Sequence, residues 1–131
     1  MLRADVEIIC RFFAAWTAQD VDAALSYLAE DAELDVSRRV LDPMVLRGHD
    51  GYRRLIAVLD EVWARQTAEP EDFIEVGDQY VVPVRLTSVG HSGATVSAHA
   101  AWVVEVKHGQ VTRACVYQST AEALEAVGLS E

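Results

Sequence analysis

Four carboxylates lie close together in the stretch "LSYLAEDAELDVSRRV", residues 25–40: Glu30, Asp31, Glu33 and Asp35. Two carboxylic groups in one site can divide the roles of general acid and general base, because their mutual repulsion keeps one of them protonated. The spacing therefore raises the question of whether these acids form a catalytic pair. The answer depends on the face of the chain that each of them occupies.

Asp35 is the sharpest candidate among these acids. Residues 32–37 alternate strictly between apolar and polar side chains, which predicts a β-strand with two distinct faces. The apolar set is Ala32, Leu34 and Val36, and the opposite face holds Glu33 and Asp35. Asp35 is therefore predicted to point away from the buried side unless a bulge at Ser37 turns it inward. We expect an ion pair with Arg38 or Arg39 rather than catalysis.

His49 and Gln118 complete a candidate catalytic set with Asp35. A histidine at the mouth of a cavity exchanges protons near neutral pH, and strand parity allows Gln118 to point inside. The competing interpretation for His49 is a hydrogen bond to the backbone, because "RGHDG" is a helix-start signal. The four histidines show no short metal-ligand spacing, so we expect neither a metal site nor a cofactor.

The elements that position these residues follow from the periodicity of apolar side chains. Steps of three and four residues predict helices, and alternating runs between turn signals predict strands. The predicted helices cover 4–18, 21–29 with Asp20 as its N-cap, 50–65 and 120–128. The predicted strands cover 32–37, 71–76, 79–89, 94–107 and 110–119, and a loop around Pro43 covers 38–48. This order is typical of an α+β fold, in which a long curved sheet wraps around three N-terminal helices and a short helix follows it.

The composition limits the class of protein. With 131 residues, 51% of them hydrophobic, the chain is expected to form one domain with its own core. Its formal net charge of -10 opposes binding to nucleic acids and to anionic membranes. Asp5 and Glu7 interrupt the apolar run that a secretion signal needs, so we expect a cytoplasmic protein. Cys10 and Cys115 are expected to be buried free thiols.

Several motifs in this order point to a known family. They are "AAWTAQDVDAALSYLAEDAELDVS", "LRGHDGYRRLI", "IEVGDQYVVPVRL", "VEVKHGQVTRACVY" and "ALEAVGLSE". Across residues 1–131 the chain resembles the SnoaL-like branch of the nuclear transport factor 2 superfamily. The resemblance implies a cone-shaped α+β barrel, usually a homodimer, whose open end admits a small molecule. It also implies that the convex sheet face meets a second subunit, and the residues predicted there are His99, Ala101, Val103, Cys115 and Tyr117.

The resemblance also locates three known chemistries, and the key residues of each are absent. Ketosteroid isomerases place a general base where this chain has Val36, and hydrogen-bond donors where it has Phe12 and Trp102. Limonene epoxide hydrolases use an Arg-x-Asp pair, whereas Arg85 is followed here by Leu and Thr. The aspartate that these hydrolases and the SnoaL-type cyclases keep on the last strand corresponds to Val116. The resemblance therefore implies the fold without these activities.

The side chains predicted to face the interior form an apolar pocket suited to a hydrophobic or aromatic ligand. The predicted pocket residues are Phe12, Trp16, Val36, Tyr52, Ile56, Trp102, Val116 and Gln118. The competing interpretation is that the apolar members are simply core. We expect a homodimer that binds a small, largely apolar molecule. The alternatives are an isomerase, cyclase or hydrolase using Asp35, His49 and Gln118, and a structural dimerisation module with a filled cone.

Overall fold

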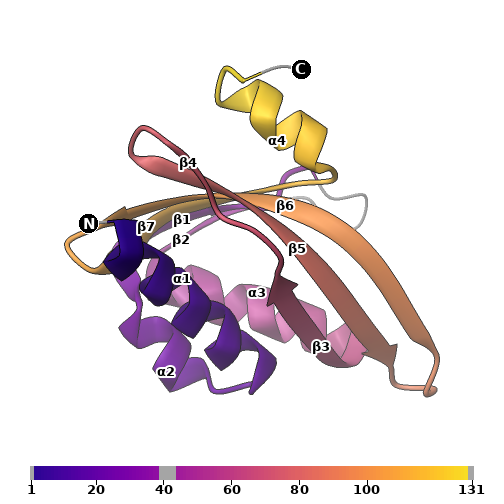
Figure 1. Cartoon of the computed structure of the whole chain (residues 1–131). Helices are drawn as coiled ribbons and strands as arrows, with labels where there is room; N and C mark the ends of the chain where they lie inside the picture. The colour runs from indigo at the N-terminus through magenta and orange to yellow at the C-terminus, as the bar shows by residue number, and fades with distance from the viewer. Residues whose placement is uncertain (1, 39–43, 130–131) are drawn as a thin grey trace.

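A curved β-sheet separates three helices on its concave side from one short helix on its convex side (Figure 1). The computed structural model describes residues 2–38 and 44–129, with the backbone alone at residues 2 and 3. Residues 39–43 of the loop predicted around Pro43 therefore lie outside the described residues, and Arg39 is one of them. The helices are α1 (Leu2–Thr17), α2 (Val21–Ser26), α3 (Gly48–Val62) and α4 (Thr120–Ala126). In this part of the chain, no helix has the length and apolar character needed to span a membrane.

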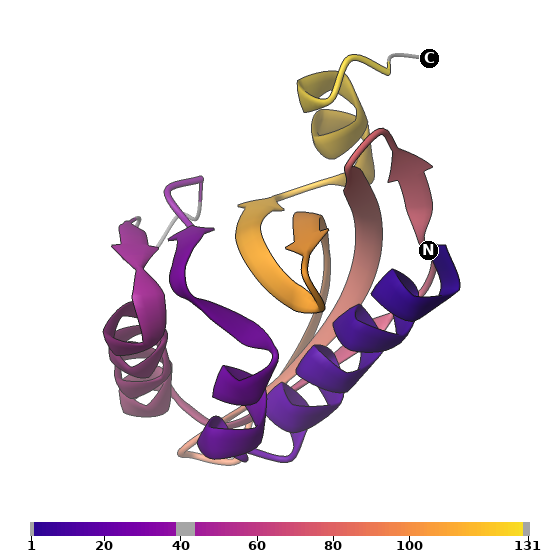
Figure 2. The same cartoon turned by 90° about the vertical axis from the view of Figure 1, so that its left-hand side faces the viewer.

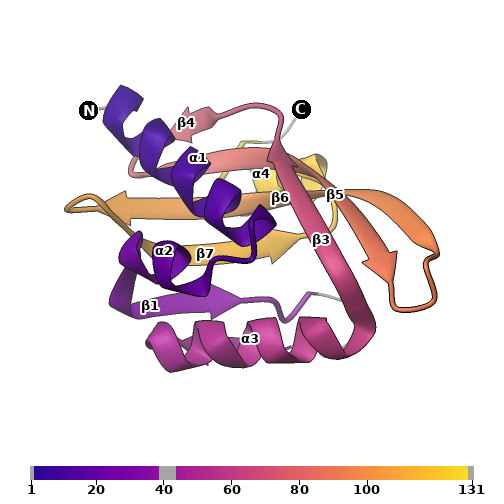
Figure 3. The ribbon, with the colours of Figure 1, turned by 90° about the horizontal axis from the view of Figure 1, so that it is seen from below.

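The sheet is mixed and does not close into a barrel. Its strands are β1 (Leu28–Asp35), β2 (Val45–Arg47), β3 (Trp63–Pro70), β4 (Ile74–Val76), β5 (Gln79–Gly90), β6 (Thr95–Lys107) and β7 (Gln110–Tyr117). They lie in the order β2-β1-β7-β6-β5-β3, with β4 also paired to β5, and only the β1–β7 pair of this described sheet is parallel. Figure 2 shows the strands curving around α1 and α2, and Figure 3 shows α3 alongside β1. The predicted α+β fold class is confirmed.

Two strands were not predicted, and both owe their conformation to distant partners. β2 lies within the expected loop and pairs with β1, where Leu46 faces Leu34. β3 replaces the end of the helix predicted over 50–65, because Trp63 and the residues after it pair with the second half of β5. β4 covers only the first residues of β5, so the rest of that long strand has room for another partner. Pairing with β5 thus overrides the local helix propensity.

The second helix is shorter, and the first strand longer, than predicted. Asp20 caps α2 as predicted, because its Oδ1 accepts a hydrogen bond from Ala23 N at 3.1 Å. The helix nevertheless ends at Ser26. The next carbonyl, that of Tyr27, accepts a hydrogen bond from Val111 N at 2.7 Å, which draws the chain into the sheet before the predicted strand start.

The motif "RGHDG" contains a glycine, Gly48, that the start of α3 requires. Its φ of +71° lies in the left-handed region that favours glycine. A Cβ built at this position would lie 2.7 Å from the carbonyl oxygen of Glu30 in β1. Only glycine therefore allows α3 to begin this close to β1, and α3 supplies one wall of the pocket described below.

Two hydrophobic clusters lie on opposite faces of the sheet. The concave cluster is centred on aromatic side chains that are at most 8% exposed: Phe12, Phe13, Trp16, Tyr52 and Trp102. The convex cluster is smaller and lies under α4; its buried members are Val81, Ala101, Val103, Cys115 and Ala123.

Both cysteines are free, and Cys115 is buried as predicted. The prediction for Cys10 was wrong, because this residue is exposed on α1.

The outer edge of β3 is joined to α1 by one side chain. The Oγ1 atom of Thr17 accepts a hydrogen bond from Ala68 N at 3.0 Å and donates one to Ala68 O at 3.4 Å. The last residue of α1 is thereby held against the middle of β3. These two elements supply neighbouring parts of the same pocket rim, so the bonds keep that rim in place.

Candidate functional site

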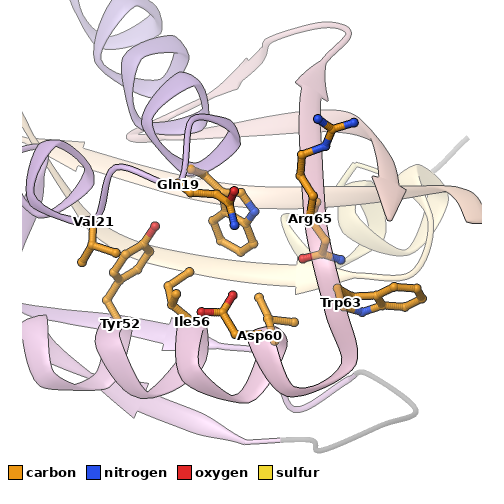
Figure 4. A pocket seen from close by; sticks show the side chains of 10 residues that line it. Gln19, Val21, Tyr52, Ile56, Asp60, Trp63 and Arg65 are labelled. Atoms are coloured by element: carbon orange, nitrogen blue, oxygen red, sulfur yellow. The ribbon is translucent and has the colours of Figure 1, made fainter. Parts of the chain in front are cut away.

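A pocket of about 320 Å³ opens between the α1–α2 turn, α3 and the start of β3 (Figure 4). We call it the mouth pocket. Its apolar wall consists of Trp16, Val21, Tyr52, Ile56, Leu59 and Trp63, and its polar groups are Gln19, Asp60, Arg65 and Gln66. Figure 4 shows Tyr52, Ile56 and Asp60 on α3, with Arg65 across from them on β3. This volume is within the ordinary range of small-molecule sites.

A second space, of about 80 Å³, lies between α3 and the concave face of the sheet. We call it the inner pocket. Its walls are Trp16, Val36, Leu55, Leu59, Gln66, Leu86, Trp102 and Val116. The two pockets share the side chains of Trp16, Leu59 and Gln66, which therefore separate one space from the other. The inner pocket has room for only a small part of a ligand.

Edge-to-face contacts hold the aromatic walls in place. The Trp16 ring lies 6.2 Å from that of Tyr52 and 5.5 Å from that of Trp102, with interplanar angles of 75° and 83°. Contacts of this kind contribute about 0.5–1.5 kcal/mol each beyond the area that they bury. Burial raises the pKa of the Tyr52 hydroxyl, so this group stays protonated near neutral pH and can donate a hydrogen bond. Within the described part of the chain, Trp102 Nε1 has no hydrogen-bond partner.

The structure places the predicted pocket residues as follows. Six line the mouth pocket or the inner pocket: Trp16, Val36, Tyr52, Ile56, Trp102 and Val116. Phe12 packs behind them, with its ring edge-on to those of Trp16 and Tyr52. Gln118 lies outside both pockets, where its Nε2 donates a hydrogen bond to Arg38 O at 2.7 Å. Binding by the six lining residues stays a prediction.

Asp35 lies on the convex side of β1, as its parity predicts. It is 9% exposed, and it faces Cys115 of β7 in the register of the sheet. Its Oδ1 accepts hydrogen bonds from Ser37 N at 3.0 Å and Ser37 Oγ at 2.6 Å, and its Oδ2 forms the expected ion pair with Arg38 at 3.2 Å. Burial raises the pKa of Asp35, but the hydrogen bonds from Ser37 and Arg38 outweigh this effect and lower the pKa overall. The carboxylate is committed to this network.

His49 is anchored to the backbone. Its Nε2 donates a hydrogen bond to Leu28 O at 2.8 Å, which agrees with the helix-start interpretation. The ring lines a shallow hollow with Glu30 and Asp50, away from the mouth pocket. Asp35 and Gln118 both contact Arg38, on the other hand. The structure therefore does not bring the predicted catalytic set together in one cavity, and its catalytic role stays a prediction.

Sequence reasoning missed the polar groups of the mouth pocket. Arg65 and Gln66 lie on β3, which was predicted in part as helix, and Asp60 lies near the end of α3. Gln19 is in the α1–α2 turn with a φ of +59°, a conformation that a glutamine in the sequence does not predict. One signal was available: the strand predicted over 79–89 is longer than the strand before it and implies a further partner.

The predicted convex face is only partly open to a second subunit. Ala101 pairs with Tyr117 and Val103 with Cys115, so these residues share one face as predicted. The side chains of Ala101, Val103 and Cys115 are already buried under α4 (Figure 1). His99 remains exposed near Glu71, and Tyr117 lies under the guanidinium of Arg38, whose Cζ is 4.6 Å from the ring centroid.

These features define a class: small α+β proteins whose curved sheet holds a pocket at the concave mouth. A family model described as the SnoaL-like domain matches residues 9–114. The chain therefore belongs to the SnoaL-like family, as its motifs predict. A comparison with curated protein sequences finds no match.

Solved structures with the same fold cover nearly the whole chain. TerC, co-crystallised with polyporic acid, is 23% identical, with a TM-score of 0.78 over 95% of this chain and 98% of that one. A protein from Catenulispora acidiphila with a ketosteroid isomerase-like fold, in complex with trimethylamine, is 17% identical, with a TM-score of 0.75 over 94% and 93%. RV0760c from Mycobacterium tuberculosis, in complex with estradiol-17beta-hemisuccinate, is 16% identical, with a TM-score of 0.75 over 88% and 94%. At these identities the likeness shows the fold alone.

Proposed function

We propose that this protein binds a small, largely apolar molecule, with an aromatic portion, in the mouth pocket. The observation that carries the proposal is a ligand-sized space whose wall combines the rings of Trp16 and Tyr52 with Ile56 and Leu59. Apolar surface removed from water contributes about 25 cal/mol per Å², and flat rings add stacking contacts. TerC and RV0760c, which share the fold, were each crystallised with a small molecule, in line with this proposal.

The mouth pocket helps to decide between ligand binding and the two alternative functions. A structural module with a filled cone would leave no space of this size, so the pocket favours binding. The alternative of an isomerase, cyclase or hydrolase requires convergent catalytic groups, and Asp35, His49 and Gln118 lie outside the mouth pocket. The polar groups that line the mouth pocket are therefore better suited to recognising a ligand than to catalysis by this set.

Replacing Ile56 with tryptophan tests the proposal. This half-buried residue lines the mouth pocket, so the larger side chain is expected to occupy the ligand space without disturbing the core. With the neutral fluorescent probe N-phenylnaphthylamine, we expect saturable binding to the wild type. In Ile56→Trp the affinity should fall at least about tenfold, the equivalent of 1.4 kcal/mol.

The matched control is Ala57→Trp, which adds the same side chain at the next, exposed position of α3 outside the pocket. It should bind the probe as the wild type does. Circular dichroism checks that both variants remain folded. Equal binding by the wild type and Ile56→Trp would show that the probe binds elsewhere, and the proposed site would be wrong.

We also propose a homodimer, with the partner along the unpaired edge of β6 that adjoins His99 of the predicted convex face. β7 pairs with β6 only as far as Ala101, so residues 95–100 of β6 have an unpaired edge within the described sheet. This segment projects beyond the helices in Figures 1 and 3, and Val96 is 50% exposed. An exposed strand edge without a charged residue in this segment other than His99 is suited to pairing with another chain.

Sedimentation velocity tests the dimer. We expect the wild type to sediment as a dimer at micromolar concentrations, and Val96→Asp to shift toward monomer because a charge would be buried in the contact. Val62→Asp is the control, since Val62 is also exposed, at 43%, but lies at the end of α3. A wild-type monomer, or an equal shift in both variants, contradicts the proposed interface.

A further inference from the structure

Arg65 differs from the other basic residues of the protein. Among the lysine and arginine side chains that the structure describes, nearly all have a carboxylate within 3.7 Å. The exceptions in these ranges are Arg54 and Arg65. Of these two, Arg65 lines the mouth pocket and Arg54 lines neither pocket. With 21 acidic residues in the chain, an arginine without an acidic partner is an unexpected finding at a ligand site.

The backbone of Arg65 is part of the sheet, just after an irregularity between Trp63 and Arg65. Its partner in the register of β3 and β5 is Val89, so the guanidinium extends from a paired strand rather than from a loop. Figure 4 shows the side chain on the opposite side of the pocket from Asp60, and no ion pair joins these two described residues. The mouth pocket thus has a cationic side on β3 and an anionic side on α3.

We propose that Arg65 makes the mouth pocket selective for an apolar, aromatic molecule that carries an anionic group, such as a carboxylate or an acidic phenol. This inference rests on the proposed function and names the class of its ligand. A guanidinium presents paired N–H groups that match a carboxylate, while the rings of Trp16 and Tyr52 contact the apolar part. Asp60 fixes the orientation, because it repels an anionic group on the α3 side.

The net charge of the protein supports the assignment of anion selectivity to Arg65. A protein with a formal net charge of -10 repels anions at long range, so an anionic ligand gains little from the general field. Local pairing with Arg65 is therefore needed for the pocket to prefer an acid over its neutral analogue. The contribution of Arg65, measured as the difference in naphthoate affinity between the wild type and Arg65→Gln, should decrease with added salt, since Arg65 is exposed and exposed charges are screened.

The test compares naphthoate with naphthamide, which have the same rings and differ in charge. Calorimetric titration of the wild type should give a dissociation constant for naphthoate about tenfold below that for naphthamide. In Arg65→Gln the affinity for naphthoate should fall by about this factor, and the affinity for naphthamide should be unchanged. Asp60→Asn should bind naphthoate more tightly than the wild type.

Arg54→Gln is the matched control, because it removes the same charge from another arginine without a partner and leaves both pockets intact. It should keep the wild-type preference. An equal loss in Arg54→Gln and Arg65→Gln, or a preference unchanged by Arg65→Gln, overturns the inference. The proposed function has its own criterion. It stands, whatever the effect of Arg65→Gln, if both probes bind to the wild type and Ile56→Trp abolishes the binding of both. If neither probe binds, both proposals fail.

Discussion

Replacing Trp102 with alanine is expected to lower the free energy of unfolding by about 3–5 kcal/mol. The Trp102 ring is 4% exposed and contacts the ring of Phe13 at 5.0 Å and that of Trp16 at 5.5 Å, in both cases edge to face. Truncation would leave a cavity next to the inner pocket, because the surrounding sheet and helix cannot collapse fully. Urea unfolding followed by circular dichroism measures this loss.

Trp102→Phe is the control for this prediction. It keeps a ring against Phe13 and Trp16, and it removes the Nε1 group that has no hydrogen-bond partner in the described structure. We expect a loss below about 1.5 kcal/mol, because removal of the buried N–H offsets part of the lost volume. Equal losses in the alanine and phenylalanine variants would contradict the packing argument.

Replacing Asp35 with alanine is expected to cost about 2–3 kcal/mol of stability without changing ligand binding. The change removes the acceptor for Ser37 and the ion-pair partner of Arg38. Probe binding at pH 7 should stay at the wild-type level, because the network lies outside the mouth pocket. A folded Asp35→Ala protein that has lost probe binding would show that this acid serves the site after all.

The stability effect of Asp35 should depend on pH. Its folded-state pKa is lowered from the ordinary value of 3.8, so its contribution is present above that value and is lost as the pH falls through the folded pKa. The difference in unfolding free energy between wild type and Asp35→Ala should therefore shrink in acid. Asp31→Ala, at an exposed position of the same strand, should show almost no difference at any pH.

Most of the fold could be predicted from local patterns. The apolar stripe of α1, the cap at Asp20 and the alternation of the hairpin strands depend on neighbours in the sequence, and the structure contains each of these elements. β2 and β3 could not be predicted in this way, since their backbone partners lie in β1 and β5. At Trp63 the residue type suits both a helix face and a strand, and pairing with β5 decides between them.

The site was less predictable than the fold, for a geometric reason. Strand parity correctly separated Val36, which lines the inner pocket, from Asp35 on the other face. Parity says nothing about the rim, where a turn, a helix end and an unpredicted strand meet. Gln19 and Arg65 line the same pocket only because the α1–α2 turn and β3 meet at that point. The proposed ligand recognition depends on these rim residues, and the core pattern does not reveal them.

The two hydrogen bonds between Thr17 and Ala68 also protect the protein against aggregation. The N–H and C=O of Ala68 face away from β5, and both are occupied by one hydroxyl. An extended segment of another chain therefore finds neither a donor nor an acceptor at this residue of the outer strand. A side chain from a helix thus acts in place of a neighbouring strand, so this edge is protected against unwanted growth of the sheet while the pocket beside it stays open.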